Sequence, residues 1–193
     1  MGCKNNNILI TGISGFVGSL LARELMDTGA NVYGLVRRRS DGQIPYNIKR
    51  QKIEKGINLI EGDLESISSL GNAITISSPD IIFHFGAQSF IPRSFSDPLE
   101  TMNTNCCGTA NLLEAIRLKD ADPIVVFAGS SEEYGLVISS SQQYDRAKSR
   151  YGSVFPEPQR IPEIPISEEN PLRPMSPYAV SKVYGDYLMR NYW

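Results

Sequence analysis

A glycine-rich turn near the N-terminus has the composition of a phosphate-binding loop. Residues 11–18 read Thr-Gly-Ile-Ser-Gly-Phe-Val-Gly, after a short apolar run and before an amphipathic one. Gly12 permits a tight turn, Gly15 lets the backbone approach a pyrophosphate, and Gly18 lets a helix pack against the preceding strand. The N–H groups and the positive dipole end of that helix would then bind the anion. A purely structural turn is the alternative, but the position between a strand and a helix favours dinucleotide binding.

Tyr178 and Lys182 form a second candidate group, because their spacing of four residues puts both on one face of a helix. A nearby ammonium favours the phenolate form of a tyrosine. Tyr178 could then accept a proton from a hydroxyl group while hydride leaves the same carbon for a nicotinamide. Ser130, which follows an apolar run, could hold that hydroxyl or the developing carbonyl oxygen. A coincidental pair on a surface helix is the alternative, which this spacing alone would favour.

Alternating strands and helices are predicted to position these residues. Apolar runs predict strands at 7–11, 31–36, 57–61, 80–85 and 124–128, and helical spacing predicts helices at 16–28, 64–76, 99–119 and 178–193. Strands that are apolar on both faces and separated by helices imply right-handed crossovers and a parallel sheet covered on both sides. The predicted fold is therefore α/β, a Rossmann-type doubly wound parallel sheet in a single domain, residues 1–193.

One stretch, residues 136–177, interrupts the alternation. Seven of the twelve prolines fall between Pro156 and Pro177, and the preceding residues 139–150 are polar and rich in Ser, Gln and Arg. Such a composition excludes a central strand and a long helix. We interpret the stretch as a long surface loop inserted into the domain, which would act as a lid, a contact or a linker.

The overall composition narrows the class of protein. The 193 residues are 41% apolar and 21% charged, with a formal net charge of −2, so no nucleic-acid or membrane partner is indicated. The three cysteines form neither an even set nor a CxxC motif, so neither a disulfide framework nor a metal site is expected. Because no apolar run is long enough for a membrane span and no secretory signal is visible, a cytoplasmic location is expected. The single histidine, His84, lies in an apolar run and is predicted to be a packed core residue.

Three widely separated motifs together resemble the extended short-chain dehydrogenase/reductase family, which includes NAD-dependent epimerases and dehydratases. They are the GxxGxxG turn, Ser130 four residues before Tyr134-Gly135, and the YxxxK sequence of Tyr178 and Lys182. The resemblance implies that Ser130, Tyr178 and Lys182 are catalytic. It implies cofactor contacts from the following residues: Thr11, Gly12, Ser14, Gly15, Phe16, Val17, Gly18, Asp63, Leu64, Phe85, Gly86, Ala87, Ser89, Tyr178 and Lys182.

The resemblance also suggests roles for individual residues. Asp63 would bind the adenine, and a helix N-cap is a compatible second role. Residues 85–89 would lie beside the cofactor phosphates and ribose. Asn105 matches the asparagine of the family's NxxGT motif and would support the site, although ordinary helix packing explains it nearly as well.

The end of the predicted second strand bears on the choice of cofactor. An NAD-dependent enzyme usually carries Asp or Glu there to bind the adenosine ribose. This sequence has Arg37 and Arg38 instead, within a basic stretch, residues 37–55, that contains seven basic and two acidic residues. Because guanidinium groups bind phosphate in a bidentate manner, NADP is predicted in preference to NAD. Arg39 and residues 49–55 are interpreted as solvated surface.

Within the family, the sequence is most similar to GDP-mannose 4,6-dehydratases. The similarity lies in Glu132 two residues after Ser130, in Ser131, in the paired arginines, in Ala87-Gln88-Ser89 and in Ser94-Phe95. It implies that GDP-mannose is oxidised at C4 by Tyr178 and NADP, that Glu132 removes the C5 proton as the C6 hydroxyl leaves, and that hydride returns to C6. Two departures are Ser130, where Thr is usual, and the long 136–177 loop. A nucleotide-sugar 4-reductase or 4-epimerase, or a nucleotide-binding regulator without turnover, are the alternatives.

The C-terminus is close to the candidate site. The sequence stops eleven residues after Lys182, whereas family members continue with further strands and a smaller domain that binds the nucleotide sugar. We therefore expect an NAD(P)-binding Rossmann domain truncated before the C-terminal substrate domain. This chain alone is expected to bind NADP(H) weakly and to be inactive, and the full-length protein is expected to be a homo-oligomer.

Overall fold

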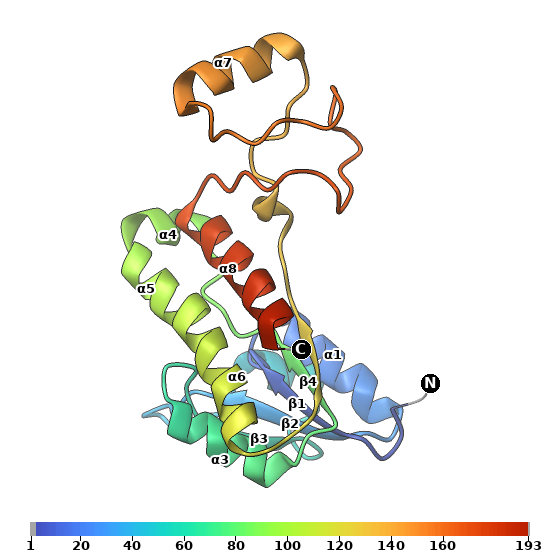
Figure 1. Ribbon diagram of the computed structural model, residues 1–193. Helices are drawn as coiled ribbons and strands as arrows, with labels where there is room; N and C mark the ends of the chain where they lie inside the picture. The colour runs from blue at the N-terminus through green and yellow to red at the C-terminus, as the bar shows by residue number, and fades with distance from the viewer. Residues whose placement is uncertain (1–2, 193) are drawn as a thin grey trace.

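The strands form one parallel sheet. A computed structural model describes residues 3–192 (Figure 1). Its strands are β1 (Asn7–Thr11), β2 (Asn31–Val36), β3 (Asn58–Glu61), β4 (Ile81–His84) and β5 (Ile124–Phe127), all paired in parallel in the order β3-β2-β1-β4-β5. The order reverses between β1 and β4, which is where open α/β sheets bind ligands. The predicted Rossmann-type doubly wound sheet is confirmed, with strand ends that differ from the prediction by at most one residue.

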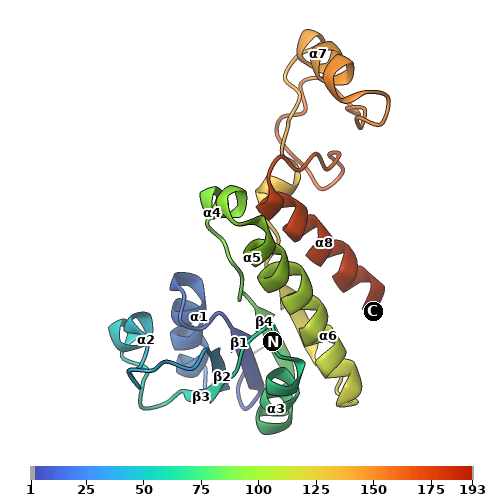
Figure 2. The same ribbon diagram turned by 90° about the vertical axis from the view of Figure 1, so that its left-hand side faces the viewer.

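Helices cover both faces of the sheet (Figures 1 and 2). One face carries α1 (Phe16–Asp27) and α2 (Tyr46–Gln51), and the other carries α3 (Ile67–Ser77), α6 (Gly108–Leu118) and α8 (Pro177–Tyr192). The remaining helical segments are α4 (Ile91–Ser96), α5 (Pro98–Met102), the π-helical turn η1 (Asn103–Cys107), the 3-10 turn η2 (Ser131–Glu133) and α7 (Ser141–Tyr151). Between residues 3 and 192, no helix is both long enough and apolar enough to cross a membrane.

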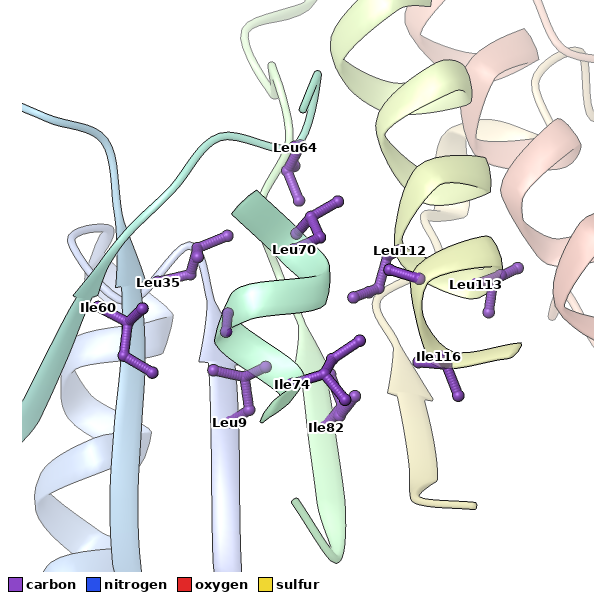
Figure 3. Packing of buried hydrophobic residues seen from close by; sticks show 12 residues of the cluster. Leu9, Leu35, Ile60, Leu64, Leu70, Ile74, Ile82, Leu112, Leu113 and Ile116 are labelled. Carbon is purple, nitrogen blue, oxygen red and sulfur yellow. The ribbon is translucent and has the colours of Figure 1, made fainter. Parts of the chain in front are cut away.

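The apolar residues of β1 divide between two buried clusters, one on each face of the sheet. Ile8 and Ile10 belong to the cluster with α1 and α2, whereas Leu9 belongs to the cluster with α3 and α6. Figure 3 shows the second cluster, in which Leu9 lies near Ile74 of α3. Burial of one such side chain contributes about 1.5–3 kcal/mol. A strand that is apolar on both faces therefore needs helices on both sides.

The predicted helices 64–76 and 99–119 differ from those observed. The first begins three residues later, at Ile67, because the Ser66 hydroxyl accepts a hydrogen bond from the Ser69 N–H at 3.3 Å and so caps the helix. The second is divided into α5, the π-helical turn η1 and α6, because tertiary contacts of buried Asn105 hold the wider turn. Such turns are frequent at functional sites. Trp193, the last residue of the predicted helix 178–193, lies outside the described residues.

The prediction that residues 139–150 belong to a loop is wrong, because most of them form α7. The Ser140 hydroxyl accepts a hydrogen bond from the Gln143 N–H at 3.2 Å and caps the helix. Ala147 packs with Ile138 and Phe155 in a small separate core. The Gln, Lys and Arg side chains that make the sequence polar are also good helix formers. Figures 1 and 2 show α7 apart from the sheet, on the side where α8 begins.

A buried ion pair holds the 136–176 segment together. Arg173 donates to both carboxylate oxygens of Glu163, at 2.7 and 2.9 Å, and both side chains are almost fully buried. The guanidinium also donates to the carbonyl groups of Leu136 and Pro156. The Arg173 N–H donates to the Glu133 carbonyl, which joins the segment to the turn η2, and the Arg173 carbonyl accepts from the Leu136 N–H, which holds the two ends of the segment together.

Close packing between α8 and β5 yields the first testable prediction. An added Cβ at Gly185 would clash with Cζ of Phe127, whose ring packs against His84. Gly185→Ala is therefore expected to lower the free energy of unfolding by about 1–3 kcal/mol, as overpacking does. Gly71→Ala in α3 is the matched control, because its added Cβ meets only the flexible end of Lys119. Thermal unfolding of both variants measures the difference, and equal stabilities would contradict the prediction.

Candidate active site

A cavity of about 910 Å³ lies at the carboxyl ends of β1, β2 and β3. Its size is within the range of about 300–1,000 Å³ that is typical of small-molecule and cofactor sites. It borders the reversal of strand order between β1 and β4. Eight of the predicted cofactor residues line it: Gly12, Ser14, Arg37, Arg38, Asp63, Leu64, Gly86 and Ala87. The loops that follow four neighbouring strands therefore converge on one cavity.

The other residues predicted to bind the cofactor are not in the lining of this cavity. Thr11 is buried beneath it, and Gly15 and Gly18 shape the turn at the start of α1. Phe16 and Val17 are exposed at the same end of α1, Ser89 is exposed after β4, and Phe85 packs against a core cluster. Tyr178 and Lys182 belong to the catalytic group on α8.

The glycine turn brings the loops after β1 and β4 into close contact. Gly12 has φ +73°, and an added Cβ would lie 2.7 Å from the backbone nitrogen of Gly86. An added Cβ at Gly18 would lie 2.5 Å from the Gly12 carbonyl oxygen. Gly15, the N-cap residue of α1, has no side chain with which to cap the first N–H groups of the helix. These features fit a backbone that binds a pyrophosphate.

His84 connects the loop after β4 to α6. Thr109 donates its hydroxyl proton to the Asn105 carbonyl at 2.6 Å, so its oxygen accepts from His84 Nε2 at 3.1 Å. His84 Nδ1 must then accept the Thr11 hydroxyl at 2.7 Å, and that oxygen accepts the Gly86 N–H at 3.0 Å. Burial lowers the pKa of His84 to about 3, so the ring is neutral near pH 7. The prediction of a packed core histidine is confirmed.

The three arginines after β2 have different partners. Arg39 is bound by Asp41, with nitrogen–oxygen distances of 3.0 and 2.6 Å, and the pair holds the pKa of that carboxyl well below its usual range. All three arginines are exposed and line the cavity, but among them only Arg39 has a carboxylate partner in the described residues. Arg37 and Arg38 are therefore the guanidinium groups placed to bind a phosphate, whereas Arg39, predicted to be solvated surface, is occupied by Asp41 at the edge of the same cavity.

Asn47 on α2 is a supporting residue that the sequence interpretation missed. Its side-chain N–H donates to the carbonyl oxygen of Ser14 at 2.8 Å, which ties α2 to the glycine turn. The signal for this role in the sequence is weak, because α2 has only six residues and Asn47 contacts a residue 33 positions earlier in the chain.

Asp63 lies in the cavity lining but does not cap α3. Its Oδ1 accepts the Glu65 N–H at 3.0 Å, and its backbone exchanges hydrogen bonds with the Ser69 hydroxyl. The suggested N-cap role is wrong, since Ser66 fills it. The carboxylate therefore remains next to the cavity, where the resemblance places an adenine contact.

Ser130 and Glu132 are held in one tight turn after β5. The Ser130 hydroxyl oxygen accepts the Glu132 N–H at 3.2 Å, which leaves the hydroxyl proton available for a substrate oxygen. Glu132 is half-buried, whereas its neighbour Glu133 is buried and accepts the Ser130 N–H at 2.7 Å. The turn therefore gives the two glutamates different environments.

Tyr178 and Lys182 lie on the first turns of α8, which packs against η2 and β5. Both side chains are buried. The Lys182 ammonium donates to the Ala128 carbonyl at 2.8 Å and lies 4.8 Å from the centre of the Phe127 ring. Burial lowers the pKa of Lys182, and the charge of Glu133 partly offsets that effect. The structure thus brings Ser130, Tyr178 and Lys182 to the same end of the sheet.

Asn105 joins this helix to the loop after β4. Its Oδ1 accepts the Gln88 N–H at 2.8 Å, and its Nδ2 donates to the Gln88 carbonyl at 3.0 Å and to the Ser181 hydroxyl at 2.9 Å. The side chain is 4% exposed. Asn105 therefore supports the position of α8, as its motif suggested, and does more than fill space between helices.

Comparisons with known proteins agree with this arrangement. GDP-mannose 4,6-dehydratase of Vibrio cholerae serotype O1 is 35% identical over 190 residues, which are 95% of this chain and 44% of the relative. The Homo sapiens GDP-mannose 4,6 dehydratase is 33% identical, over 100% of this chain and 47% of its own length. The chain therefore spans less than half the length of these curated relatives.

Solved structures extend the similarity to the fold. UDP-glucose 4-epimerase from Brucella ovis, in complex with NAD, has a TM-score of 0.72 and 24% identity, covering 97% of this chain and 47% of its own. UDP-glucose 4-epimerase of Thermus thermophilus, also complexed with NAD, has a TM-score of 0.70 and 26% identity, covering 96% and 50%. Residues 8–193 match the NAD dependent epimerase/dehydratase family. The chain belongs to that family.

Proposed function

We propose that the protein containing this chain is a GDP-mannose 4,6-dehydratase that uses NADP. The observation that carries the proposal is the turn η2, which holds Glu132 beside the Ser130 hydroxyl, at the end of β5 and against the helix with Tyr178 and Lys182. The names of the Vibrio cholerae and Homo sapiens relatives support the choice of substrate and reaction. Homo-oligomerisation and a cytoplasmic location stay predictions.

Each residue has one task in this reaction. Tyr178 accepts the proton of the C4 hydroxyl, assisted by the Lys182 ammonium, and Ser130 donates a hydrogen bond to the same oxygen. A bound NADP supplies the acceptor for the C4 hydride and its return to C6. Because the C4 ketone acidifies the C5 position, Glu132 removes the C5 proton as the C6 hydroxyl leaves. The hydroxide that leaves C6 and the proton taken from the C4 hydroxyl together form water. C5 regains its proton from Glu132.

The preference for NADP rests on Arg37 and Arg38. Both line the cavity, and no carboxylate from residues 37–39 competes for the ribose. The structures from Brucella ovis and Thermus thermophilus contain NAD, so the cofactor has to be tested directly in this protein.

Replacing Arg37 and Arg38 with Ala is expected to weaken NADP binding by about 1–3 kcal/mol, the range of lost hydrogen bonds to a charged group. NAD binding should change little, because NAD has no 2′-phosphate. Isothermal titration with both cofactors makes the measurement. Arg39→Ala is the matched control, since Asp41 already holds that guanidinium. Equal losses for NAD and NADP would show that Arg37 and Arg38 support folding or the pyrophosphate instead.

The activity itself is tested with the natural protein that contains this sequence. GDP-mannose and catalytic NADP, without added reductant, should yield a 4-keto-6-deoxy sugar nucleotide. The solved UDP-glucose 4-epimerases favour a 4-epimerase as the second candidate. An epimerase would convert UDP-glucose without forming a keto sugar, and a reductase would need stoichiometric NADPH. Either outcome would overturn the dehydratase proposal.

A further inference from the structure

Glu133 is a buried carboxylate that the proposed reaction does not use. It is 7% exposed, and its Oε1 accepts the Ser130 N–H at 2.7 Å. Gly129 permits this fit, because an added Cβ there would lie 3.0 Å from the same oxygen. The carboxylate therefore lies against the backbone that leads into Ser130.

The helix α8 packs against η2, the turn that carries Glu133, and its Lys182 donates to the Ala128 carbonyl, two residues before Ser130. Lys182, Asp186 and Arg190 are spaced by four residues, and all three act electrostatically on Glu133. Arg190 is already paired with Asp186 at 2.7 Å, whereas Lys182 is buried. Burial raises the pKa of Glu133 and lowers the pKa of Lys182. The positive charge of Lys182 opposes the rise for Glu133, and the negative charge of Glu133 opposes the fall for Lys182.

Asp186, one turn further along α8, is paired with Arg190, and Glu133 is the carboxylate whose charge acts on Lys182. From β5 it meets the Ala128 carbonyl and the face of the Phe127 ring, which are polar but uncharged. From β4 it faces His84, which is neutral near pH 7. From η2 it faces Glu133, the anion that favours its protonated form.

We propose that Glu133 is a positioning residue: its carboxylate fixes the backbone of Ser130 and supplies the negative charge that balances the buried Lys182 ammonium. The importance of this balance for catalysis rests on the proposed function. The electrostatic link between Glu133 and Lys182 does not depend on that function, so it can be tested without substrate.

The test separates an electrostatic role from simple capping of the turn. Glu133→Gln keeps a carbonyl oxygen that can accept the Ser130 N–H but removes the negative charge. Titration of the ¹³C-labelled Lys182 side chain by NMR, assigned with Lys182→Arg, reports the ammonium directly. Its midpoint is expected to fall by about 0.5–1 pH unit, less than the 1–3 units of a contacting pair. An unchanged midpoint would show that Glu133 is only a cap.

Two further measurements complete the test. Glu168→Gln removes an exposed carboxylate and should leave the Lys182 midpoint unchanged; an equal fall there would overturn the proposal. If Glu133→Gln does not fold, the unsubstituted protein gives the answer, because the Lys182 signal should move at the pH where the Glu133 carboxyl resonance titrates. Absence of that movement would overturn the proposal. Failure of turnover with GDP-mannose, with the Lys182 shift as expected, would reject the dehydratase and leave the electrostatic link intact.

Discussion

Replacing Glu132 with Gln is expected to slow product formation from GDP-mannose by about 10²–10⁴, the usual contribution of a positioned base. The amide keeps the shape of the side chain but cannot accept the C5 proton. Oxidation at C4 should survive, because Ser130, Tyr178 and Lys182 are unchanged. Bound NADPH should therefore accumulate, visible as near-ultraviolet absorbance, while exchange of the C5 proton with deuterium from solvent is lost.

This prediction has a matched control in the exposed Glu168. Glu168→Gln makes the same chemical change away from the turn η2, so turnover and C5 exchange should stay at their original rates. If Glu132 served only the geometry of the turn, its Gln variant would lose stability but exchange C5 normally per folded molecule. That result would remove Glu132 as the base and favour an epimerase or a reductase.

Arg173→Met is expected to destabilise the 136–176 segment by about 3–5 kcal/mol, the penalty for breaking a buried ion pair. The substitution leaves the Glu163 carboxylate buried without its cation. Hydrogen exchange of residues 136–176 should lose most of its protection, while NADP binding stays near its original value because other elements line the cavity. The exposed Arg146 supplies the control, since Arg146→Met removes the same charge from the surface of α7.

The same ion pair predicts a dependence on pH. Burial would raise the pKa of Glu163, but hydrogen bonds from Arg173 and the Ile138 N–H, together with the arginine charge, lower it below its usual value. A carboxyl group with a depressed pKa stabilises the folded state above its unfolded pKa of about 4.3, and the contribution is lost as the pH falls through the folded value. Protection of the segment should therefore decrease in acid and not between pH 6 and 8. Replacing both partners, as in Glu163→Leu with Arg173→Met, should restore much of the stability.

The sheet could be predicted because its pattern is local. β1, β2 and β4 are apolar on both faces and are followed by turns, so their assignment as buried strands needed no information from elsewhere in the chain. The division of helix 99–119 could not be predicted in this way. The π-helical turn depends on Asn105 reaching Gln88 and Ser181, which are distant in the sequence.

In the candidate site, too, local motifs could be predicted from the sequence, but contacts between distant residues could not. The glycine turn and the YxxxK spacing identify backbone and side-chain positions directly, and both groups lie at the carboxyl ends of the strands. The resemblance singles out Glu132 by its position two residues after Ser130, but it does not show what its neighbour Glu133 does. Only the geometry of η2 shows that Glu132 is half-buried whereas Glu133 is buried. The helix α7 was missed for a different reason. Its polar residues show little apolar periodicity and prolines follow it, whereas its stability comes from the Ser140 cap and a small core of its own.

The chain leaves the turn η2 before Leu136 and comes back beside that turn at Arg173, and the backbones of Leu136 and Arg173 are hydrogen-bonded to each other. Two ends that already meet can be joined by a short turn with little change in loop-closure entropy. The intervening residues form a removable module, which protein engineering could delete, shorten or replace with a reporter domain. The same geometry would let length vary at this point between homologous genes by insertion and deletion, while the spacing of Ser130 and Tyr178 in three dimensions stays constant.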